Sequence, residues 1–125
     1  MQIRVYYEDT DIGGVVYYAN YLKFCERARS ELFFKREMMP YSESGHFFVK
    51  NLQAEYLASA KLGDLLDVQT KLLKISAASF VLHQEIVCGE QKLFEMDITL
   101  VYVDLKGRVK RLDKETRALI KELFA

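Results

Sequence analysis

One helical pattern stands ahead of a long series of strand patterns, and this order limits the folds that the chain can adopt. Only one early segment, 18–36, has apolar residues at helical spacing with charged residues on the opposite face. Its apolar positions are Tyr21, Phe24, Cys25, Ala28, Leu32 and Phe33. Between 47 and 104, apolar residues mostly alternate with polar ones, as in half-buried strands.

Turn residues divide the rest of the chain into elements. The pattern predicts strands over 2–7, 47–60, 66–72, 80–88 and 94–102, an irregular connection over 38–45, and a short C-terminal helix capped by Asp113. Consecutive strands joined by short turns pair antiparallel, and a curled sheet around the helix is the simplest way to bury both elements. We therefore expect an α+β fold with a five-stranded antiparallel sheet around one long helix, in a single domain over 1–125.

Composition and charge limit the partners. The 18 basic and 18 acidic side chains cancel, so nothing favours nucleic acid or an anionic membrane surface. Cys25 and Cys88 lie in apolar segments without metal-like spacing and are predicted to be buried thiols. No apolar run approaches about 18 residues, and the chain begins with a strand pattern rather than a signal sequence. These features predict a soluble, cytoplasmic protein without a transmembrane segment.

The best candidate for chemistry is Asp11, in the acidic loop before the long helix. Gly13 and Gly14 follow it, and glycines let the backbone approach a ligand closely. A helix start offers unpaired N–H groups and the positive end of the helix dipole, which can polarise a carbonyl oxygen. From spacing alone, a turn-stabilising or capping role for Asp11 is the more common one. Tyr7 and Tyr18 flank the loop, and their side chains either pack in the core or wall or hold a substrate. His46 and His83 are far apart in the sequence and have no partners at the spacing of metal ligands.

The same residues carry a family resemblance. The motif Tyr7-Glu8-Asp9-Thr10-Asp11, the stretch Gly14-Val15-Val16-Tyr17 with Ala19-Asn20-Tyr21, and the segment Glu26-Arg27-Ala28-Arg29 resemble the YbgC branch of the 4-hydroxybenzoyl-CoA thioesterase family. The resemblance extends through Tyr56, Gly63-Asp64 and Ser79, and so covers nearly the whole chain. It implies the hotdog fold and hydrolysis of an acyl-CoA thioester at a site between two subunits of a homodimer or homotetramer.

The resemblance also implies roles for individual residues. The carboxylate of Asp11 is the catalytic group, and a backbone N–H near Tyr18 holds the thioester oxygen, with no metal and no cofactor. YbgC-type sequences usually carry His where this chain has Tyr18, so the main chain rather than the side chain is expected to act there. The expected catalytic group comprises Asp11, Tyr18 and Tyr7, and the expected substrate-binding group comprises Val15, Asn20, Phe48, Val49 and Ser79. Phe48 and Val49 are expected to come from the partner subunit.

Two other functions remain open at this stage. A hotdog dehydratase or hydratase would need a histidine paired with a carboxylate, and the loop around Asp11 contains no histidine. A non-catalytic acyl-CoA-binding or interaction module would use the same pocket and the same dimer surface. The residues alone do not separate direct attack by Asp11 from activation of a water molecule, and they do not give the length of the acyl chain.

Overall fold

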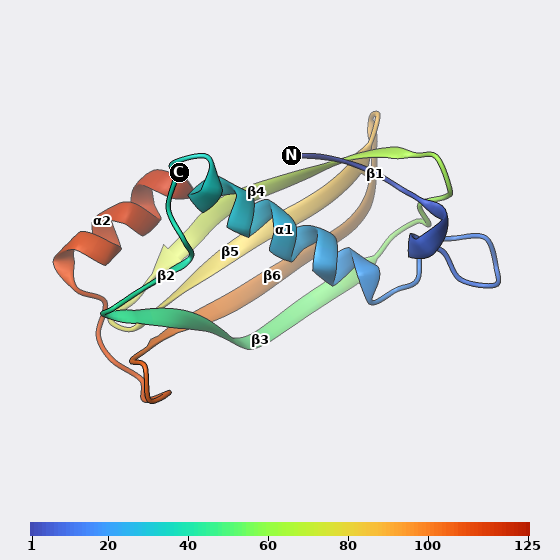
Figure 1. The fold of residues 1–125 in the computed structure, drawn as a ribbon. Coiled ribbons are helices and arrows are strands. Elements are labelled where there is room, and N and C mark those ends of the chain that lie inside the picture. The colour runs from blue at the N-terminus through green and yellow to red at the C-terminus, as the bar shows by residue number, and fades with distance from the viewer.

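A curled, fully antiparallel sheet carries one long helix across its inner face (Figure 1). The computed structural model describes all 125 residues. The strands are β1 (Gln2–Arg4), β2 (Tyr41–Ser42), β3 (Gly45–Tyr56), β4 (Leu65–Ile75), β5 (Ser79–Cys88) and β6 (Gln91–Val103), in the spatial order β1-β4-β5-β6-β3-β2. The helices are α1 (Asn20–Phe34) and α2 (Lys114–Leu123). Neither helix is long and apolar enough to cross a membrane.

The expected α+β class is confirmed, and the sheet has six strands instead of five. The additional strand, β2, lies in the segment predicted to be an irregular connection and pairs with the first two residues of β3. Gly45 makes this hairpin possible, because a side chain there would collide with the main-chain oxygen of Val103. The sequence pattern missed β2 because two residues are too few to show alternation.

Alternation along the strands places the core between α1 and the sheet. Residues of β4, β5 and β6 that face the helix are almost fully buried, as are Tyr21, Phe24, Cys25 and Ala28 of α1. The inner-face core positions are Leu66, Val68, Phe80, Leu82, Ile86, Phe94, Met96, Ile98 and Leu100. Burial raises the pKa of the Cys25 thiol to about 12. Cys88 is only partly buried, so the prediction of two buried thiols is correct for Cys25 alone.

The ends of two predicted elements also differ from the sequence pattern. The first strand ends at Arg4, and Tyr7–Asp9 forms a short 3-10 turn in which Asp9 Oδ2 accepts a 2.8 Å hydrogen bond from the Tyr6 amide. α1 begins at Asn20 rather than Tyr18. At the other end of the chain, Asp113 Oδ1 accepts a 2.8 Å hydrogen bond from the Thr116 amide, which confirms the predicted cap of α2.

β3 has a long exposed edge and an exposed inner face. Only its first two residues pair with β2, so the rest of its outer edge has no partner strand. α1 packs against β4 and β5, and the inner-face residues Val49, Leu52 and Tyr56 of β3 stay 48%, 38% and 48% exposed. A long edge strand with exposed apolar side chains is a surface that proteins normally cover.

Candidate active site

The loop that carries Asp11 closes on itself through the main chain. The Asp11 amide donates to the Val15 carbonyl at 2.9 Å, and the Gly14 amide donates to the Asp11 carbonyl at 3.0 Å. Gly14 adopts a φ of 80°, a left-handed conformation that glycine adopts without steric cost. Thr10 and Val16 pair as an isolated bridge below this turn. The loop is therefore a defined structure, with Asp11 on its exposed side.

The carboxylate of Asp11 has one occupied oxygen and one free oxygen. Oδ1 accepts a 2.8 Å hydrogen bond from the Gly13 amide, which is the turn-stabilising interaction considered from the sequence. No other group of the chain donates a hydrogen bond to this side chain, which is exposed. A Cβ at position 13 would lie 3.1 Å from Oδ1, so glycine there keeps space beside the carboxylate. The turn contact fixes Asp11 and leaves one oxygen for chemistry.

The start of α1 presents free backbone donors. The carbonyl of Tyr17 accepts from the Asn20 amide at 2.8 Å, and the carbonyl of Tyr18 accepts from the Tyr56 hydroxyl at 2.9 Å. In a trans peptide the N–H points opposite to the C=O, so the amides of Tyr18 and Ala19 point away from these partners and donate to no group in the chain. No side chain caps the helix, and its first turn holds no acidic residue.

Two hydrogen bonds fasten the loop to the helix start. The carbonyl of Asp9 accepts from the Tyr17 amide at 3.0 Å and from Nδ2 of Asn20 at 2.9 Å. The Asn20 side chain thus fastens the segment before Asp11 to the first residue of α1. The sequence pointed to a contact between Asn20 and the substrate, whereas the structure shows that its amide nitrogen bonds to the main chain.

Tyrosine side chains surround this junction. Tyr18 is 63% exposed, and its ring centroid lies 4.8 Å from that of Tyr17 and 6.4 Å from that of Tyr56. Tyr7, in the 3-10 turn, is 82% exposed. Val15 is half-buried and pairs with Lys61. Tyr7, Val15, Tyr18 and Asn20 are therefore all part of the Asp11 loop or border it.

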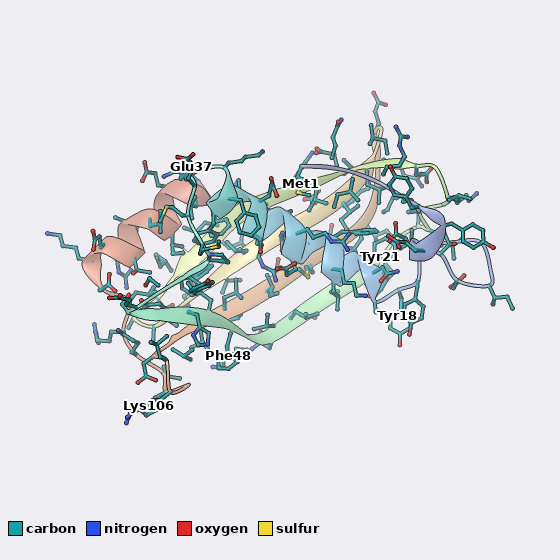
Figure 2. The ribbon with its side chains drawn as sticks, viewed as in Figure 1. Met1, Tyr18, Tyr21, Glu37, Phe48 and Lys106 are labelled. Atoms are coloured by element: carbon teal, nitrogen blue, oxygen red, sulfur yellow. The ribbon has the colours of Figure 1, made fainter.

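The structure does not bring Phe48, Val49 and Ser79 to this junction within one chain. Val49 pairs with inner-face Leu100, whereas Phe48 pairs with Val101 on the outer face, because successive strand residues point to opposite sides. Ser79 begins β5 and also pairs with Val101. Figure 2 shows Tyr18 and Phe48 at separate places on the molecule.

A cavity of about 260 Å³ lies between α1 and the exposed strand β3. Apolar side chains form most of its wall, together with Glu26, Arg29 and Ser30 of α1. The apolar lining is Phe33, Pro40, Phe47, Val49, Phe80, Leu100 and Phe124. Typical small-molecule sites measure about 300–1,000 Å³, so the cavity is large enough for part of an acyl group and too small for a complete acyl-CoA.

A buried glutamine bonded to the half-buried Arg29 of this cavity was not predicted from the sequence. Gln84 is fully buried on the inner face of β5, and its Oε1 accepts a 2.9 Å hydrogen bond from Nη1 of Arg29. Its Nε2 donates to the Cys25 carbonyl at 3.0 Å and to Thr70 Oγ1 at 2.9 Å. The available signal was a glutamine on the apolar face of a strand, between Leu82 and Ile86.

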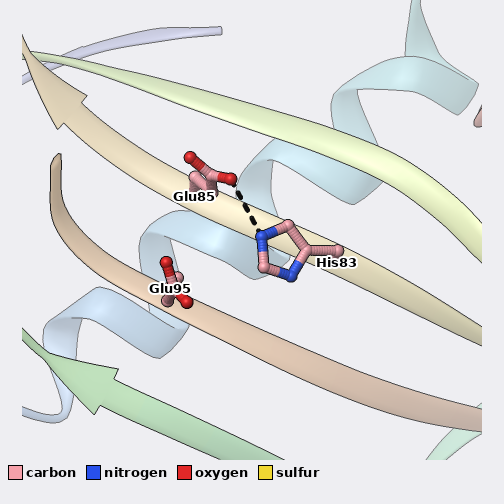
Figure 3. A group of neighbouring side chains, drawn as sticks. All are labelled: His83, Glu85 and Glu95. Carbon is pink, nitrogen blue, oxygen red and sulfur yellow. Dashed lines mark hydrogen bonds and ion pairs between the residues drawn. The ribbon is translucent and has the colours of Figure 1, made fainter. Parts of the chain in front are cut away.

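A second polar cluster lies on the outer face of the sheet (Figure 3). One ligand atom each from His83, Glu85 and Glu95 lies within 4.8 Å of the others, although their spacing in the sequence is not metal-like. Both imidazole nitrogens are already bonded, Nδ1 to Asp97 at 2.7 Å and Nε2 to Glu85 at 2.9 Å. Lys92 binds Glu95 at 2.6 Å. Each candidate ligand residue therefore already has a hydrogen-bond partner or ion-pair partner within the protein.

Comparison with known proteins decides the family. A family model for the thioesterase-like superfamily matches residues 5–120. The chain belongs to this superfamily. It is 50% identical over 95 residues to the acyl-CoA thioesterase YbgC of Helicobacter pylori, covering 76% of this chain and 71% of that protein. It is 41% identical over 127 residues to the acyl-CoA thioester hydrolase YbgC of Escherichia coli O6:H1, covering 96% and 93%.

A solved structure confirms the same arrangement of elements. The crystal structure of the probable thioesterase YbaW from Escherichia coli superposes with a TM-score of 0.86 at 27% identity, covering 100% of this chain and 98% of that one. The predicted hotdog fold and the predicted YbgC-type resemblance are thereby confirmed for this superfamily member.

Proposed function

We propose that this superfamily member hydrolyses acyl-CoA thioesters to a free acid and CoA, with the reacting carbonyl at the start of α1. The observation that carries the proposal is the pair of free amides at Tyr18 and Ala19, next to a loop that holds one free carboxylate oxygen of Asp11. The chain matches two named acyl-CoA thioesterases over most of their length, and these relatives support the substrate class. The proposed mechanism requires no metal and no cofactor.

The free amides supply electrostatic catalysis. As a nucleophile adds to the thioester carbon, negative charge develops on the carbonyl oxygen, and the free amides of Tyr18 and Ala19 stabilise that charge. A preorganised donor of this kind is typically worth about 2.7–4 kcal/mol. The positive end of the α1 dipole acts in the same direction, because no acidic residue occupies the first helical turn.

Asp11 acts at the carbon by one of two routes. As a general base, it removes a proton from water, hydroxide adds to the carbonyl, and the C–S bond breaks to give the acid and the CoA thiol; base catalysis typically contributes about 10²–10⁴-fold. As a nucleophile, its oxygen displaces the CoA thiolate and forms a mixed anhydride, which water then splits. Both routes consume one water molecule and use the same free oxygen.

The remaining substrate contacts are assigned as follows. Tyr7, Val15 and Tyr18 form the wall of the reaction site around the loop, and Asn20 holds that loop in place. Val49 lines the cavity between α1 and β3, which we assign to the acyl chain. Phe48 and Ser79 lie outside this region in the same chain, so any contact that they make with substrate comes from a second subunit.

We infer that a second copy of the chain covers β3. Its outer edge lacks a partner strand beyond β2, and Phe48 on the outer face is 50% exposed. Pairing of two such edges gives a homodimer, and a further contact between dimers gives a homotetramer. A cytoplasmic location stays a prediction.

An acyl-CoA-binding module on the same fold is the alternative. A dehydratase or hydratase is less compatible with the site, because His83 lies on the outer face of the sheet and binds Asp97 and Glu85 there. A free oxygen of Asp11 and unbonded amides at the helix start that its loop is bonded to support catalysis over binding.

The test is a series of acyl-CoAs of increasing length, with release of free thiol as the signal and with Asp11→Asn beside the wild type. Hydrolysis by the wild type and its loss in the variant support the proposal. If both proteins bind acyl-CoA in calorimetry and neither releases thiol, the binding module replaces it.

A further inference from the structure

The cavity between α1 and β3 contains a cation, Arg29, that forms no ion pair at contact distance. The ion pairs of the chain engage other basic groups, and no carboxylate oxygen lies within 4.0 Å of the Arg29 guanidinium. Its one hydrogen bond within the chain goes to Gln84. Desolvation by burial lowers the pKa of Arg29, and the smaller effects of Cys25 and of Glu26 on the same helix oppose this shift. A guanidinium stays protonated in proteins. A largely buried charge of this kind is costly unless an anion or several acceptors satisfy it.

Gln84 holds this cation in a fixed position. Both protons of its amide nitrogen are used, on the Cys25 carbonyl and on Thr70, so the oxygen of the amide is fixed toward Arg29. One guanidinium nitrogen is engaged there, and a guanidinium has further N–H donors in a rigid plane. Because Arg29 also lines the cavity, the remaining donors are available to a ligand inside it.

We propose that Arg29 recognises a carboxylate at the far end of the acyl chain, so that the enzyme favours acyl-CoAs whose chain ends in a second acid group. This inference rests on the proposed thioesterase function and adds the class of acyl group. A planar guanidinium matches a carboxylate with two parallel hydrogen bonds. Glu26 also lines the cavity, but it is exposed and its Oε1 accepts from the Ser30 hydroxyl, so the more buried position belongs to the cation.

The distance from the start of α1 to Arg29 determines how long such an acyl chain must be. Arg29 follows Asn20 by nine residues, which corresponds to roughly 14 Å along the helix axis. Exposed inner-face residues of β3 connect the two places: Tyr56 bonds to Tyr18 at the helix start, Leu52 follows, and Val49 lines the cavity. A fully extended chain of roughly a dozen carbons covers this distance, since a C–C bond is about 1.5 Å long.

The experiment compares two pairs of substrates that differ only in the distal acid. The long pair is dodecanoyl-CoA and the mono-CoA thioester of dodecanedioic acid; the short pair is hexanoyl-CoA and adipoyl-CoA, which cannot reach Arg29. For the wild type, we expect kcat/KM to be about tenfold higher or more for the long diacid thioester than for dodecanoyl-CoA, mainly through KM. The short pair should show no such preference.

Two variants separate recognition from general damage. Arg29→Met should remove the preference within the long pair, and Arg29→Lys, which keeps a charge without the planar fork, should retain part of it. Arg27→Met is the matched control, because Arg27 is exposed on the same helix and lies over the Phe24 ring at 6.0 Å; it should leave the preference unchanged. Calorimetry with free dodecanedioate and dodecanoate on the Asp11→Asn protein gives the same comparison without turnover.

The outcomes distinguish this inference from the function on which it rests. Hydrolysis of dodecanoyl-CoA at least as fast as the diacid thioester, with no effect of Arg29→Met on their ratio, overturns the role of Arg29 and leaves the thioesterase intact. Absence of hydrolysis with every substrate overturns the thioesterase. In that case, tighter binding of dodecanedioate that depends on Arg29 still supports the recognition site, and equal binding of both acids overturns it as well.

Discussion

The hydroxyl of Tyr56 donates a 2.9 Å hydrogen bond to the main-chain carbonyl of Tyr18, and this bond joins the end of β3 to the start of α1. It fixes the peptide that follows Tyr18, whose N–H is one of the two unbonded amides. The Tyr56 ring is held in turn by edge contacts with Tyr21 and Phe94, with centroids 5.4 Å and 5.1 Å away. The orientation of the candidate oxyanion donors therefore depends on a residue 38 positions along the chain.

Tyr56→Phe removes this hydrogen bond and keeps the ring contacts. We expect kcat to fall several-fold with a smaller change in KM, because the freed peptide no longer holds its amide in one orientation. The free energy of unfolding should fall by only about 0.5–1.5 kcal/mol, the usual value of one hydrogen bond. Steady-state kinetics and urea unfolding measure the two effects. Tyr41→Phe, at an exposed tyrosine of β2, is the control.

Asp11→Asn should lower kcat by at least two orders of magnitude while fold and oligomeric state remain unchanged. The amide oxygen can still accept from Gly13, so the turn survives, whereas the negative oxygen needed as base or nucleophile is lost. Glu8→Gln removes one charge from the same loop and should keep activity near the wild-type value. Near-normal turnover of Asp11→Asn would show that this carboxylate has no part in the chemistry.

Tyr18→Phe should be mild, with kcat/KM within a few-fold of the wild type. The proposed contribution of this residue is its backbone N–H, which the substitution retains, and its side chain is 63% exposed. Measurement across pH 6 to 9 is decisive. Loss of a hundredfold or more, or disappearance of a titration in the pH–rate profile, would assign an acid–base role to the phenol.

Asn20→Ala removes the bond from the side chain to the Asp9 carbonyl. We expect kcat to fall about tenfold, because the loop that carries Asp11 is no longer fastened to the helix start. Substrate affinity should change less, since Nδ2 already bonds to the main chain. Asn20→Ser, which keeps a short polar group, should recover part of the activity; a rise in KM alone would instead indicate direct contact with the substrate.

The His83 network predicts a pH-dependent contribution to stability. The hydrogen bond to Asp97 raises the pKa of His83, the bond to Glu85 adds to this, and partial burial opposes it. A group whose pKa is raised on folding stabilises the protein fully below its unfolded pKa, about 6.5, and this gain is lost as pH rises through the folded pKa. The stability difference between wild type and His83→Gln in urea unfolding should therefore shrink from pH 6 to pH 9. A constant difference would contradict a charged imidazole.

Local sequence patterns identified most of the elements because they depend on neighbours a few residues apart. Helical spacing located α1, alternation located the long strands, and Asp113 marked the start of α2. The attachment of the acidic loop to the helix start was also predictable, since only a short glycine-containing segment separates them. A two-residue strand such as β2 is too short to show an alternating pattern.

Contacts between distant residues were decided by the tertiary structure. Tyr56 reaches Tyr18 only because β3 pairs with β6 in one register, and Arg29 reaches Gln84, 55 positions away, only because α1 crosses the inner face at one angle. A register shift between Val49 and Asn51 further changes which side chains of β3 face the cavity. The sequence determined the elements and the loop that carries Asp11. Sheet register and helix crossing, which depend on packing of the whole core, decided what surrounds it.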